Sequence, residues 1–282
     1  MEHEAQITLA KQFHALHHAP KMLILPNAWD AGSAVIFERA GFGAVGTTSA
    51  GIAYSLGYPD GQHISLSDVI EVERYMLRRI HIPLSVDVES GYGANPVQVA
   101  ETVRAVIEAG AVGINLEDGL FSAEAALIPL NEQCRRIQAL AALKLELEIP
   151  FFINARTDVY WLSVGNREDR LASTIERCAA FMEAGADGVF VPGQLSPDII
   201  GNLVRSLDAP LNVIAAPSNP TVAELQDLGV SRLSLGSGPA RAALGLVQKM
   251  AYELRQQGSF SSMVSNATPY NEMNRFFGNQ ND

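Results

Sequence analysis

The fold is decided by the stretch IEAGAVGINLED, residues 107–118, in which a helix-like run ends at a glycine and a β-rich run follows at once. The same pattern occurs three more times, as ERAGFGAVGTTS (38–49), MEAGADGVFVPG (182–193) and LQDLGVSRLSLGS (225–237). In each copy the first glycine stands where the end of a helix favours a left-handed residue. These glycines are Gly41, Gly110, Gly185 and Gly229. The repeated unit is therefore a helix followed by a strand.

Eight β-rich runs alternate with amphipathic helical runs, which predicts an α/β fold of the (β/α)8, or TIM, barrel type. The runs expected as strands are 23–26, 44–49, 84–90, 113–118, 151–156, 188–193, 211–216 and 232–237. An open doubly wound sheet is the alternative, but it needs another account of eight similar units. We expect one catalytic barrel domain over residues 1–257 and a C-terminal extension over 258–282. The extension either frays or packs on a neighbouring subunit.

The composition limits the classes of partner. The chain has 282 residues, of which 48% are hydrophobic, and a net charge of -11. That excess of acidic residues argues against a nucleic acid or an anionic membrane as the main partner, since both require basic patches. No apolar run reaches the roughly 18 residues of a membrane span, and only two cysteines occur. We therefore expect a cytoplasmic protein that acts on a small molecule.

Three of the predicted strands end in polar residues that stand two positions apart. The segments are SVDVE (85–89), INLED (114–118) and FFINAR (151–156). Because successive side chains of a strand point to opposite faces, each segment presents two polar groups to one face. The pairs are Asp87 with Glu89, Asn115 with Glu117, and Asn154 with Arg156. Burial of several carboxylates against one arginine is prohibitive without a compensating charge, and a hard divalent cation would supply it. The sequence thus predicts a metal-dependent active site.

Each candidate residue also has a purely structural interpretation. The acids of the three segments are either site residues or an ion-pair network, and their position at the carboxyl ends of barrel strands favours the site. Arg156 offers either a planar fork to a substrate carboxylate or an ion pair to one of those acids. Asp60 is either a turn residue or a member of the site. Asp118 has the opposite parity and is the weaker candidate, and we interpret His17 and His18 as a solvated helix end.

As a set, these motifs resemble the isocitrate lyase/phosphoenolpyruvate mutase superfamily. The resemblance runs from about residue 25 to about residue 250, through LPNAWDAG, TTSAGIAYSLGYPDG, SVDVESGYG, INLEDG, INARTDV and PLNV. It implies a (β/α)8 barrel that binds Mg2+ or Mn2+ and a 2-oxo acid or its enolate. It also implies a homo-oligomer, a tetramer or a dimer, in which C-terminal helices swap between neighbours.

The resemblance implies a metal role for four acids. Asp87, Glu89 and Glu117 hold the ion directly or through water, and Asp60 belongs to the outer shell. The implied ion is Mg2+, with Mn2+ as the alternative, because both accept oxygen ligands.

The resemblance also implies a substrate role for five residues. Ser49 and the backbone amides of Ala50 and Gly51 bind the carboxylate or enolate oxygen of the substrate. Arg156 grips the carboxylate, and Asn212 borders the pocket. Ser49 and Arg156 are therefore expected to be catalytic as well as substrate-binding.

The chain departs from the superfamily in the loop GLFSAEAALIP, residues 119–129. Isocitrate and methylisocitrate lyases carry a Lys-Lys/Arg-Cys-Gly-His run there, whose cysteine handles a proton, and the mutases carry Lys and Asn. This loop contains no cysteine, histidine or lysine. We expect Glu124 to act as the catalytic proton carrier, with Ser122 as the alternative, beneath a mobile lid.

These observations predict a Mg2+-dependent carbon–carbon lyase for a small 2-oxo or hydroxy di- or tricarboxylate, with a pyruvate-type enolate as intermediate. Decarboxylation of oxaloacetate makes the fewest demands, because CO2 leaves without a general base. Retro-aldol or retro-Claisen cleavage needs a base, which the sequence does not identify. The alternatives are a 2-oxo-acid-binding protein without turnover and a phosphonopyruvate-type phosphonate enzyme that uses Gly236-Ser237-Gly238.

Overall fold

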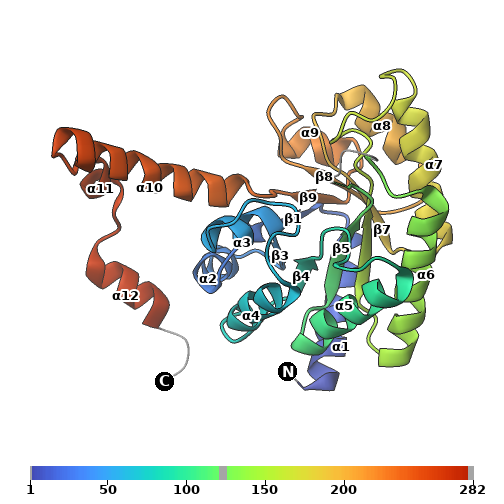
Figure 1. The fold of residues 1–282 in the computed structure, drawn as a ribbon, viewed down its shortest axis with the longest axis horizontal. Coiled ribbons are helices and arrows are strands. Elements are labelled where there is room, and N and C mark those ends of the chain that lie inside the picture. The colour runs from blue at the N-terminus through green and yellow to red at the C-terminus, as the bar shows by residue number, and fades with distance from the viewer. Residues whose placement is uncertain (1, 121–125, 279–282) are drawn as a thin grey trace. The chain divides into compact units, whose positions relative to one another are not determined.

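The computed structural model describes residues 2–120 and 126–278. The chain forms two compact units, Met1–Ser237 and Gly238–Asp282. The first unit holds the sheet and the second is helical (Figure 1). The predicted domain boundary after residue 257 coincides with the end of helix α10, Gly238–Gln257, and so lies one helix beyond the boundary between the units.

The sheet of the first unit is a nearly closed barrel of parallel strands, as predicted. The described residues form nine strands in the order β1-β9-β8-β7-β6-β5-β4-β3-β2. The strands are β1 Leu23–Leu25, β2 Asn27–Ala28, β3 Val45–Thr47, β4 Leu84–Asp87, β5 Gly113–Glu117, β6 Phe152–Arg156, β7 Gly188–Val191, β8 Leu211–Ile214 and β9 Arg232–Ser234. The first predicted strand, 23–26, corresponds to β1, and β2 lies beyond its predicted end, after Pro26, which has no N–H to donate. Because β1 pairs with β9 and β2 pairs with β3, the consecutive segments β1 and β2 bring the two ends of the sheet together and nearly close the ring.

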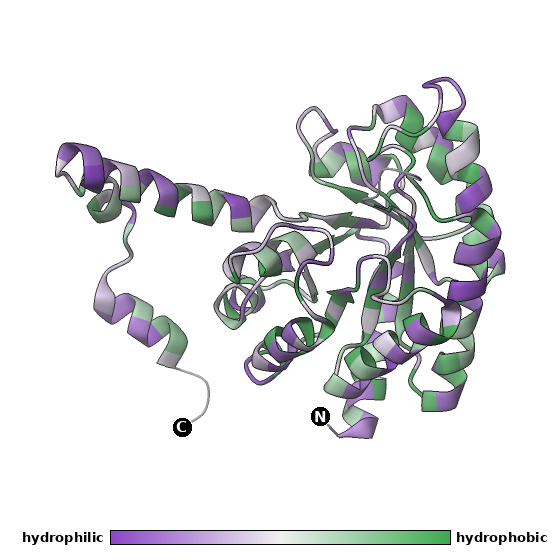
Figure 2. Ribbon diagram, viewed as in Figure 1, coloured by the Kyte–Doolittle hydropathy of each residue, from purple (hydrophilic) through white to green (hydrophobic). Residues whose placement is uncertain are grey.

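Helices of the first unit connect and surround the strands. They are α1 His3–His17, α2 Ala31–Arg39, α3 Ser49–Ser55, α4 Leu66–Leu77, α5 Pro96–Ala109, α6 Leu130–Leu147, α7 Arg170–Glu183, α8 Pro197–Ser206 and α9 Val222–Asp227. The four repeated glycines follow α2, α5, α7 and α9 with φ of 89°, 127°, 105° and 88°, which confirms the predicted left-handed turns. Figure 2 shows hydrophobic residues along the strands and mixed hydropathy along the helices. No helix in the described ranges is long and apolar enough to cross a membrane.

Several strands end earlier than the sequence pattern suggested. The second predicted strand, 44–49, stops at Thr47 because Thr48 caps α3 by accepting a hydrogen bond from the N–H of Gly51. The third, 84–90, stops at Asp87, and Glu89 has a φ of 50° in the left-handed region. Such a conformation is uncommon for a residue other than glycine and interrupts the regular strand. The predicted site residues Ser49 and Glu89 therefore follow short strands instead of lying within them.

Helix α1 packs against the amino ends of β5 and β6. The ring of Phe13 lies edge-on to Phe152 with 5.8 Å between centroids, and the His17 ring stacks on Phe152 at 3.8 Å. Gly113, the first residue of β5, leaves room for this helix, since a Cβ there would lie 2.6 Å from Cε1 of Phe13. His17 is buried and His18 exposed, so the interpretation of both as a solvated helix end is wrong for His17.

The second unit has almost no core of its own. It consists of α10, α11 Ser261–Asn266 and α12 Tyr270–Gly278, and Ala240 is the one buried residue of these helices in their described part. Large apolar side chains remain exposed, with 60% for Phe260, 62% for Val264 and 79% for Tyr270. Helices without an apolar core are not stable by themselves in water, so this unit needs a covering surface.

Candidate active site

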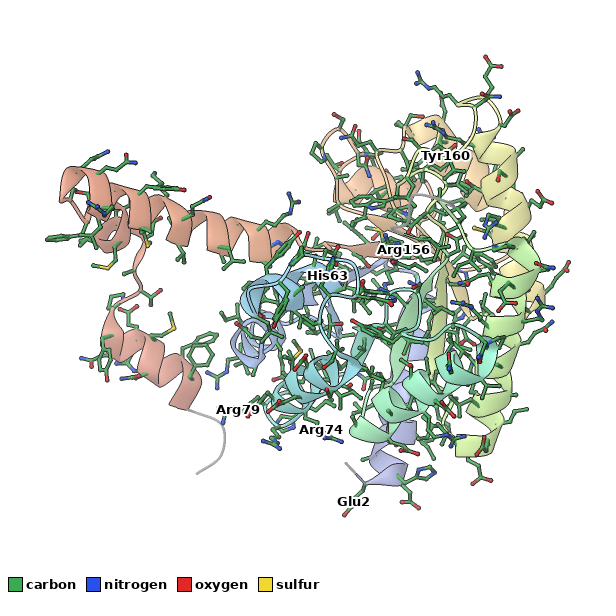
Figure 3. The ribbon with its side chains drawn as sticks, viewed as in Figure 1. Glu2, His63, Arg74, Arg79, Arg156 and Tyr160 are labelled. Atoms are coloured by element: carbon green, nitrogen blue, oxygen red, sulfur yellow. The ribbon has the colours of Figure 1, made fainter. Side chains whose placement is uncertain are left out.

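A small polar pocket of about 70 Å³ lies at the carboxyl ends of the strands. Its lining comes from β2 through β9 and from the segments that follow them. Figure 3 labels Arg156 among these strand ends, whereas Arg74 and Arg79 lie near α4. In α/β barrels this face carries the chemistry, because the loops after the strands converge there.

Most of the predicted site residues are brought together in this pocket. Its lining includes Ser49, Ala50, Asp60, Asp87, Glu89, Glu117 and Arg156. Gly51 and Asn212 are absent from the described lining: the Gly51 N–H donates to the Thr48 side chain that caps α3, and Asn212 is buried beneath the pocket. Glu124 and Ser122 lie outside the described residues. Asp118 pairs with Arg177 at 2.7 Å, which accords with its weaker standing as a candidate.

Asp87 ends β4 and organises one side of the pocket. Its Oδ2 accepts a hydrogen bond from the Ser49 hydroxyl at 3.1 Å, and its Oδ1 accepts one from the N–H of Glu89 at 3.2 Å. Asp60 lines the same side from an exposed loop. Removal from solvent, followed by the charge of Asp87, raises the pKa of Asp60. The charges of the two carboxylates therefore repel each other.

Glu89 is buried beside Asp87. One carboxylate oxygen accepts a hydrogen bond from the Tyr92 hydroxyl at 2.8 Å, and the other accepts one from the N–H of Gln62 at 2.8 Å. Burial, together with the charges of Asp87 and Asp60, raises the pKa of Glu89 to about 7 despite these bonds. At neutral pH, Glu89 is thus close to its titration midpoint.

Arg156 and Glu117 form a buried ion pair in register across β5 and β6. Nη1 of Arg156 lies 2.7 Å from Oε2 of Glu117, and its Nε donates to Oδ1 of Asp158 at 2.7 Å. Burial lowers the pKa of Arg156, but the charges of Glu117, Asp158 and Asp87 outweigh it and raise the pKa. Burial also raises the pKa of Glu117, against the opposing charge of Arg156. The guanidinium is therefore permanently charged, and its plane also faces the ring of Phe190, 5.6 Å away.

Two functional candidates were missed by the sequence reasoning. Asp158, two residues beyond β6, holds the Nε of Arg156, and no strand pattern marks it. Arg232 is the first residue of β9, 1% exposed, and donates to Asn115 on β5 and to Ser234. The parity rule that selected the acids also puts Arg232 and Ser234 on one face of β9, so a signal for them existed.

The donor set suits a hydrated divalent cation. Four carboxylates line the pocket, and Arg156 is the one cation among its described lining residues. Across residues 2–120 and 126–278, no group of three or more histidine, cysteine, aspartate or glutamate side chains is arranged to hold a metal ion directly. Mg2+ commonly keeps several waters and takes only one or two carboxylates, so oxygen donors around a polar pocket fit it. The uncompensated negative charge is what such an ion would neutralise.

These features define a class: an α/β barrel with an acidic, arginine-bearing pocket at the carboxyl ends of its strands. The model of the phosphoenolpyruvate phosphomutase family matches residues 13–255 of the chain. The chain therefore belongs to this family, within the isocitrate lyase/phosphoenolpyruvate mutase superfamily, as the sequence motifs predicted. Members of this superfamily include Mg2+-dependent lyases, mutases and hydrolases.

Individual relatives differ in activity. An uncharacterized protein of Mycobacterium tuberculosis is 39% identical over 236 residues, covering 82% of this chain and 84% of that protein. The 2-methylisocitrate lyase of Escherichia coli is 28% identical over 274 residues, covering 93% and 90%. Oxaloacetate acetylhydrolase in complex with oxalate superposes with a TM-score of 0.83 at 27% identity, covering 97% of this chain and 95% of that one. Phosphonopyruvate hydrolase with oxalate and Mg2+ gives 0.83 at 26% identity, covering 96% and 95%.

Proposed function

We propose that this protein is a Mg2+-dependent carbon–carbon lyase that acts on a small 2-oxo or hydroxy di- or tricarboxylate through an enolate. The observation that carries the proposal is the convergence of four carboxylates and Arg156 in one pocket at the strand ends. The acids suit a divalent cation, and the guanidinium suits a carboxylate. Relatives that act on 2-methylisocitrate and oxaloacetate support this substrate class.

In this proposal, Asp87, Glu89, Glu117 and Asp60 hold the ion, partly through water. Mg2+ is expected because phosphonopyruvate hydrolase, a structural relative, binds it together with oxalate, and Mn2+ is the alternative. When bound, the ion would polarise the 2-oxo group and stabilise the negative charge that develops on its oxygen. The Ser49 hydroxyl, which donates to Asp87, would orient that carboxylate.

Arg156 binds the substrate carboxylate in this proposal. Its present partners Glu117 and Asp158 keep the guanidinium in place and charged before the substrate arrives. The ring of Phe190 restricts the guanidinium plane from one side. The amide of Ala50, at the start of α3, would donate to the carboxylate or enolate oxygen, and the Ser49 hydroxyl would do so only when its hydrogen turns from Asp87 to the substrate. The N–H of Gly51 already donates to the Thr48 side chain that caps α3, so we assign Gly51 a smaller role in substrate binding.

Decarboxylation of oxaloacetate is the reaction we favour, because the pocket lining contains no histidine, cysteine or lysine among its described residues. Loss of CO2 needs no general base, whereas retro-aldol or retro-Claisen cleavage does. We keep Glu124 as the proposed proton carrier for protonation of the enolate.

A second candidate is a phosphonopyruvate-type activity. Gly236 and Ser237 line the pocket after β9, where barrels often bind phosphate groups, and phosphonopyruvate hydrolase is a relative. A 2-oxo-acid-binding protein without turnover is the third. Competition of inorganic phosphate with the substrate would favour the phosphonate enzyme, and tight oxalate binding without turnover would favour the binding protein.

The decisive experiment follows the methyl protons of pyruvate and the loss of oxaloacetate by NMR in D2O with Mg2+. We expect metal-dependent exchange or decarboxylation that disappears in Asp87→Ala and persists in the control Asp227→Ala. Asp227 is an exposed residue at the far end of α9. Absence of both reactions in the wild-type protein, across a panel of 2-oxo and hydroxy acids, would reject the lyase proposal.

We further propose a cytoplasmic homo-oligomer, a tetramer or a dimer, that exchanges its C-terminal helices between subunits. The support is the second unit, whose described helices bury a single residue and expose large apolar side chains. A second copy of the chain would supply the missing cover.

A further inference from the structure

Arg232 lies directly beneath the floor of the pocket. It begins β9, yet its Nη2 donates to Oδ1 of Asn115 on β5 at 3.2 Å, across a sheet order in which β8, β7 and β6 intervene. Its Nε donates to the hydroxyl of Ser234 at 3.2 Å. Asn115 and Ser234 both line the pocket. The arginine therefore bonds two floor residues from opposite sides of the barrel.

The bond to Asn115 fixes which atom of that amide is free. An arginine has N–H donors and no acceptor, so the atom of Asn115 that faces it must be the oxygen. The same Oδ1 accepts a second hydrogen bond, from Nδ2 of Asn154 at 2.8 Å. With its oxygen occupied by two donors, Asn115 has its NH2 group left to offer to a molecule in the pocket.

The bond to Ser234 has a parallel effect on Asn212. Because the Ser234 hydroxyl accepts from Nε of Arg232, its own hydrogen points elsewhere, and it donates to Oδ1 of Asn212 at 3.1 Å. The remaining donor of this amide, Nδ2 of Asn212, is buried and has no hydrogen-bond partner within the described residues. The same holds for Nη1 of Arg232. Buried donors without acceptors are costly and rare, so these two indicate a buried water as their acceptor beneath the pocket.

The charge state of Arg232 supports this role. Burial lowers its pKa to about 9, and the charge of Asp87 opposes the decrease. The guanidinium thus stays protonated at neutral pH, so every one of its nitrogens remains a donor. It also lies one layer below an excess of carboxylates and balances part of their charge.

We propose that Arg232 is a positioning residue that orients the amide of Asn115, so that its NH2 group presents N–H donors to an anionic substrate, and that through Ser234 it also fixes the amide of Asn212 in the layer beneath. The inference rests on the proposed function and deepens it. A floor made of donors selects substrates whose inward-facing end is rich in acceptors, such as a carboxylate or carbonyl oxygen. It disfavours analogues that carry an amide N–H at that end.

The ligand test compares oxalate affinity by calorimetry, with Mg2+ present, in the wild-type protein, Arg232→Met, Arg232→Lys and Arg104→Met. We expect Arg232→Met to weaken oxalate binding about tenfold, the value of roughly one hydrogen bond. Mg2+ affinity measured without oxalate should not weaken, because removal of the Arg232 charge leaves the carboxylates above it more negative. Arg232→Lys should restore part of the oxalate affinity. Arg104, whose ion pair with Glu146 lies between α5 and α6, serves as the control for loss of an arginine.

A coupling measurement separates positioning from general damage. In the Asn115→Ala background the amide is gone, so adding Arg232→Met should weaken oxalate binding far less than it does in the wild-type background. Equal losses in the two backgrounds, or an Arg232→Met protein that binds oxalate like the wild type, would overturn the inference.

A ligand-free arm distinguishes failure of this inference from failure of the proposed function. Asn115→Asp introduces a carboxylate that Arg232 can pair with, so this variant alone should keep most of its thermal stability. Combined with Arg232→Met, the same carboxylate is buried without its partner, and the melting temperature should drop by more than the sum of the two single changes. If the decrease in melting temperature of the double variant equals the sum of the decreases in the two single variants, Arg232 does not hold residue 115. If the coupling holds while the wild-type protein binds no oxalate, the inference about Arg232 stands and the proposed function fails.

Discussion

Arg156 illustrates how one residue serves both the folded state and the proposed chemistry. Its Nη1 and Nε contact Glu117 and Asp158 at 2.7 Å each, in a geometry that a planar fork provides and a lysine ammonium does not. We expect Arg156→Lys to weaken oxalate binding by about tenfold to a hundredfold, or roughly 1.4 to 2.7 kcal/mol, while the protein stays folded. Calorimetry measures the affinity. Arg104→Lys is the matched control, and an unchanged affinity in Arg156→Lys would count against the carboxylate role.

Glu89 gives a prediction about pH. Its pKa is raised from 4.5 to about 7, so the folded protein holds a proton that the unfolded chain releases between these values. The stability from Glu89 is thus fully present below about pH 4.5 and is lost as the pH rises through about 7. The shift corresponds to on the order of 3 kcal/mol.

The metal-free protein should therefore melt at progressively lower temperature as the pH rises from 5 to 8. The raised pKa values of Glu117 and Asp60 act in the same direction. Calorimetric melting curves of the wild type and Glu89→Gln measure the effect, and the variant should show the smaller decline. Added Mg2+ should protect more at pH 8 than at pH 5, because ionised carboxylates bind it better. A decline that is identical in Glu89→Gln would contradict the assignment.

Much of the site could be predicted from the alternation of side chains along the strands alone. Asp87 and Glu117 were found because alternation along a strand is rigid geometry. Glu89 was found although its strand ends two residues earlier, since its left-handed backbone still leaves the side chain in the pocket. Asp158 could not be found, because a residue after a strand has no fixed direction until the chain that follows it has packed. Asn212 was placed at the border of the pocket, but its side chain is buried one layer lower.

At the scale of elements, the contact of α1 with the sheet depends on the missing side chain of Gly113. A methyl group there would meet Cε1 of Phe13 at 2.6 Å, which the packed ring cannot accommodate without moving the helix. We expect Gly113→Ala to destabilise the protein by about 1–3 kcal/mol through overpacking. Urea denaturation measures the loss. The control is Gly43→Ala, where the nearest atom, Cδ2 of Leu16, lies 3.6 Å away, and equal stability of the two variants would refute this account.

Element boundaries were harder to predict than element order. The eight helix–strand units follow from a repeated glycine and a change of hydrophobic period, which are local signals. Strand ends depend on which group satisfies the next backbone N–H, as when Thr48 caps α3 instead of extending β3. Competition of that kind is decided by three-dimensional packing and leaves no separate mark in the sequence.

At the scale of the whole molecule, the exposed apolar side chains of the second unit predict association. Light scattering should give a particle of two or four chains of 30.3 kDa each. Phe260→Lys combined with Val264→Lys should shift the protein toward smaller species, because charged groups would replace apolar contacts. Leu145→Lys, at an 80% exposed leucine of α6, is the control. A wild-type monomer at micromolar concentration would contradict the proposed oligomer.

The pairing of β1 with β9 has a consequence for how the protein is made. The first and last strands of the ring are neighbours, with Leu23 opposite Arg232 and Leu25 opposite Ser234. During synthesis the ribosome releases β1 more than 200 residues before its partner, so the nascent chain keeps two unpaired strand edges until β9 has been made. Arg232 and Ser234 arrive with that final strand. A polypeptide truncated before residue 232 therefore lacks both the closing strand and the floor of the pocket, and only chains translated past this point can assemble the site.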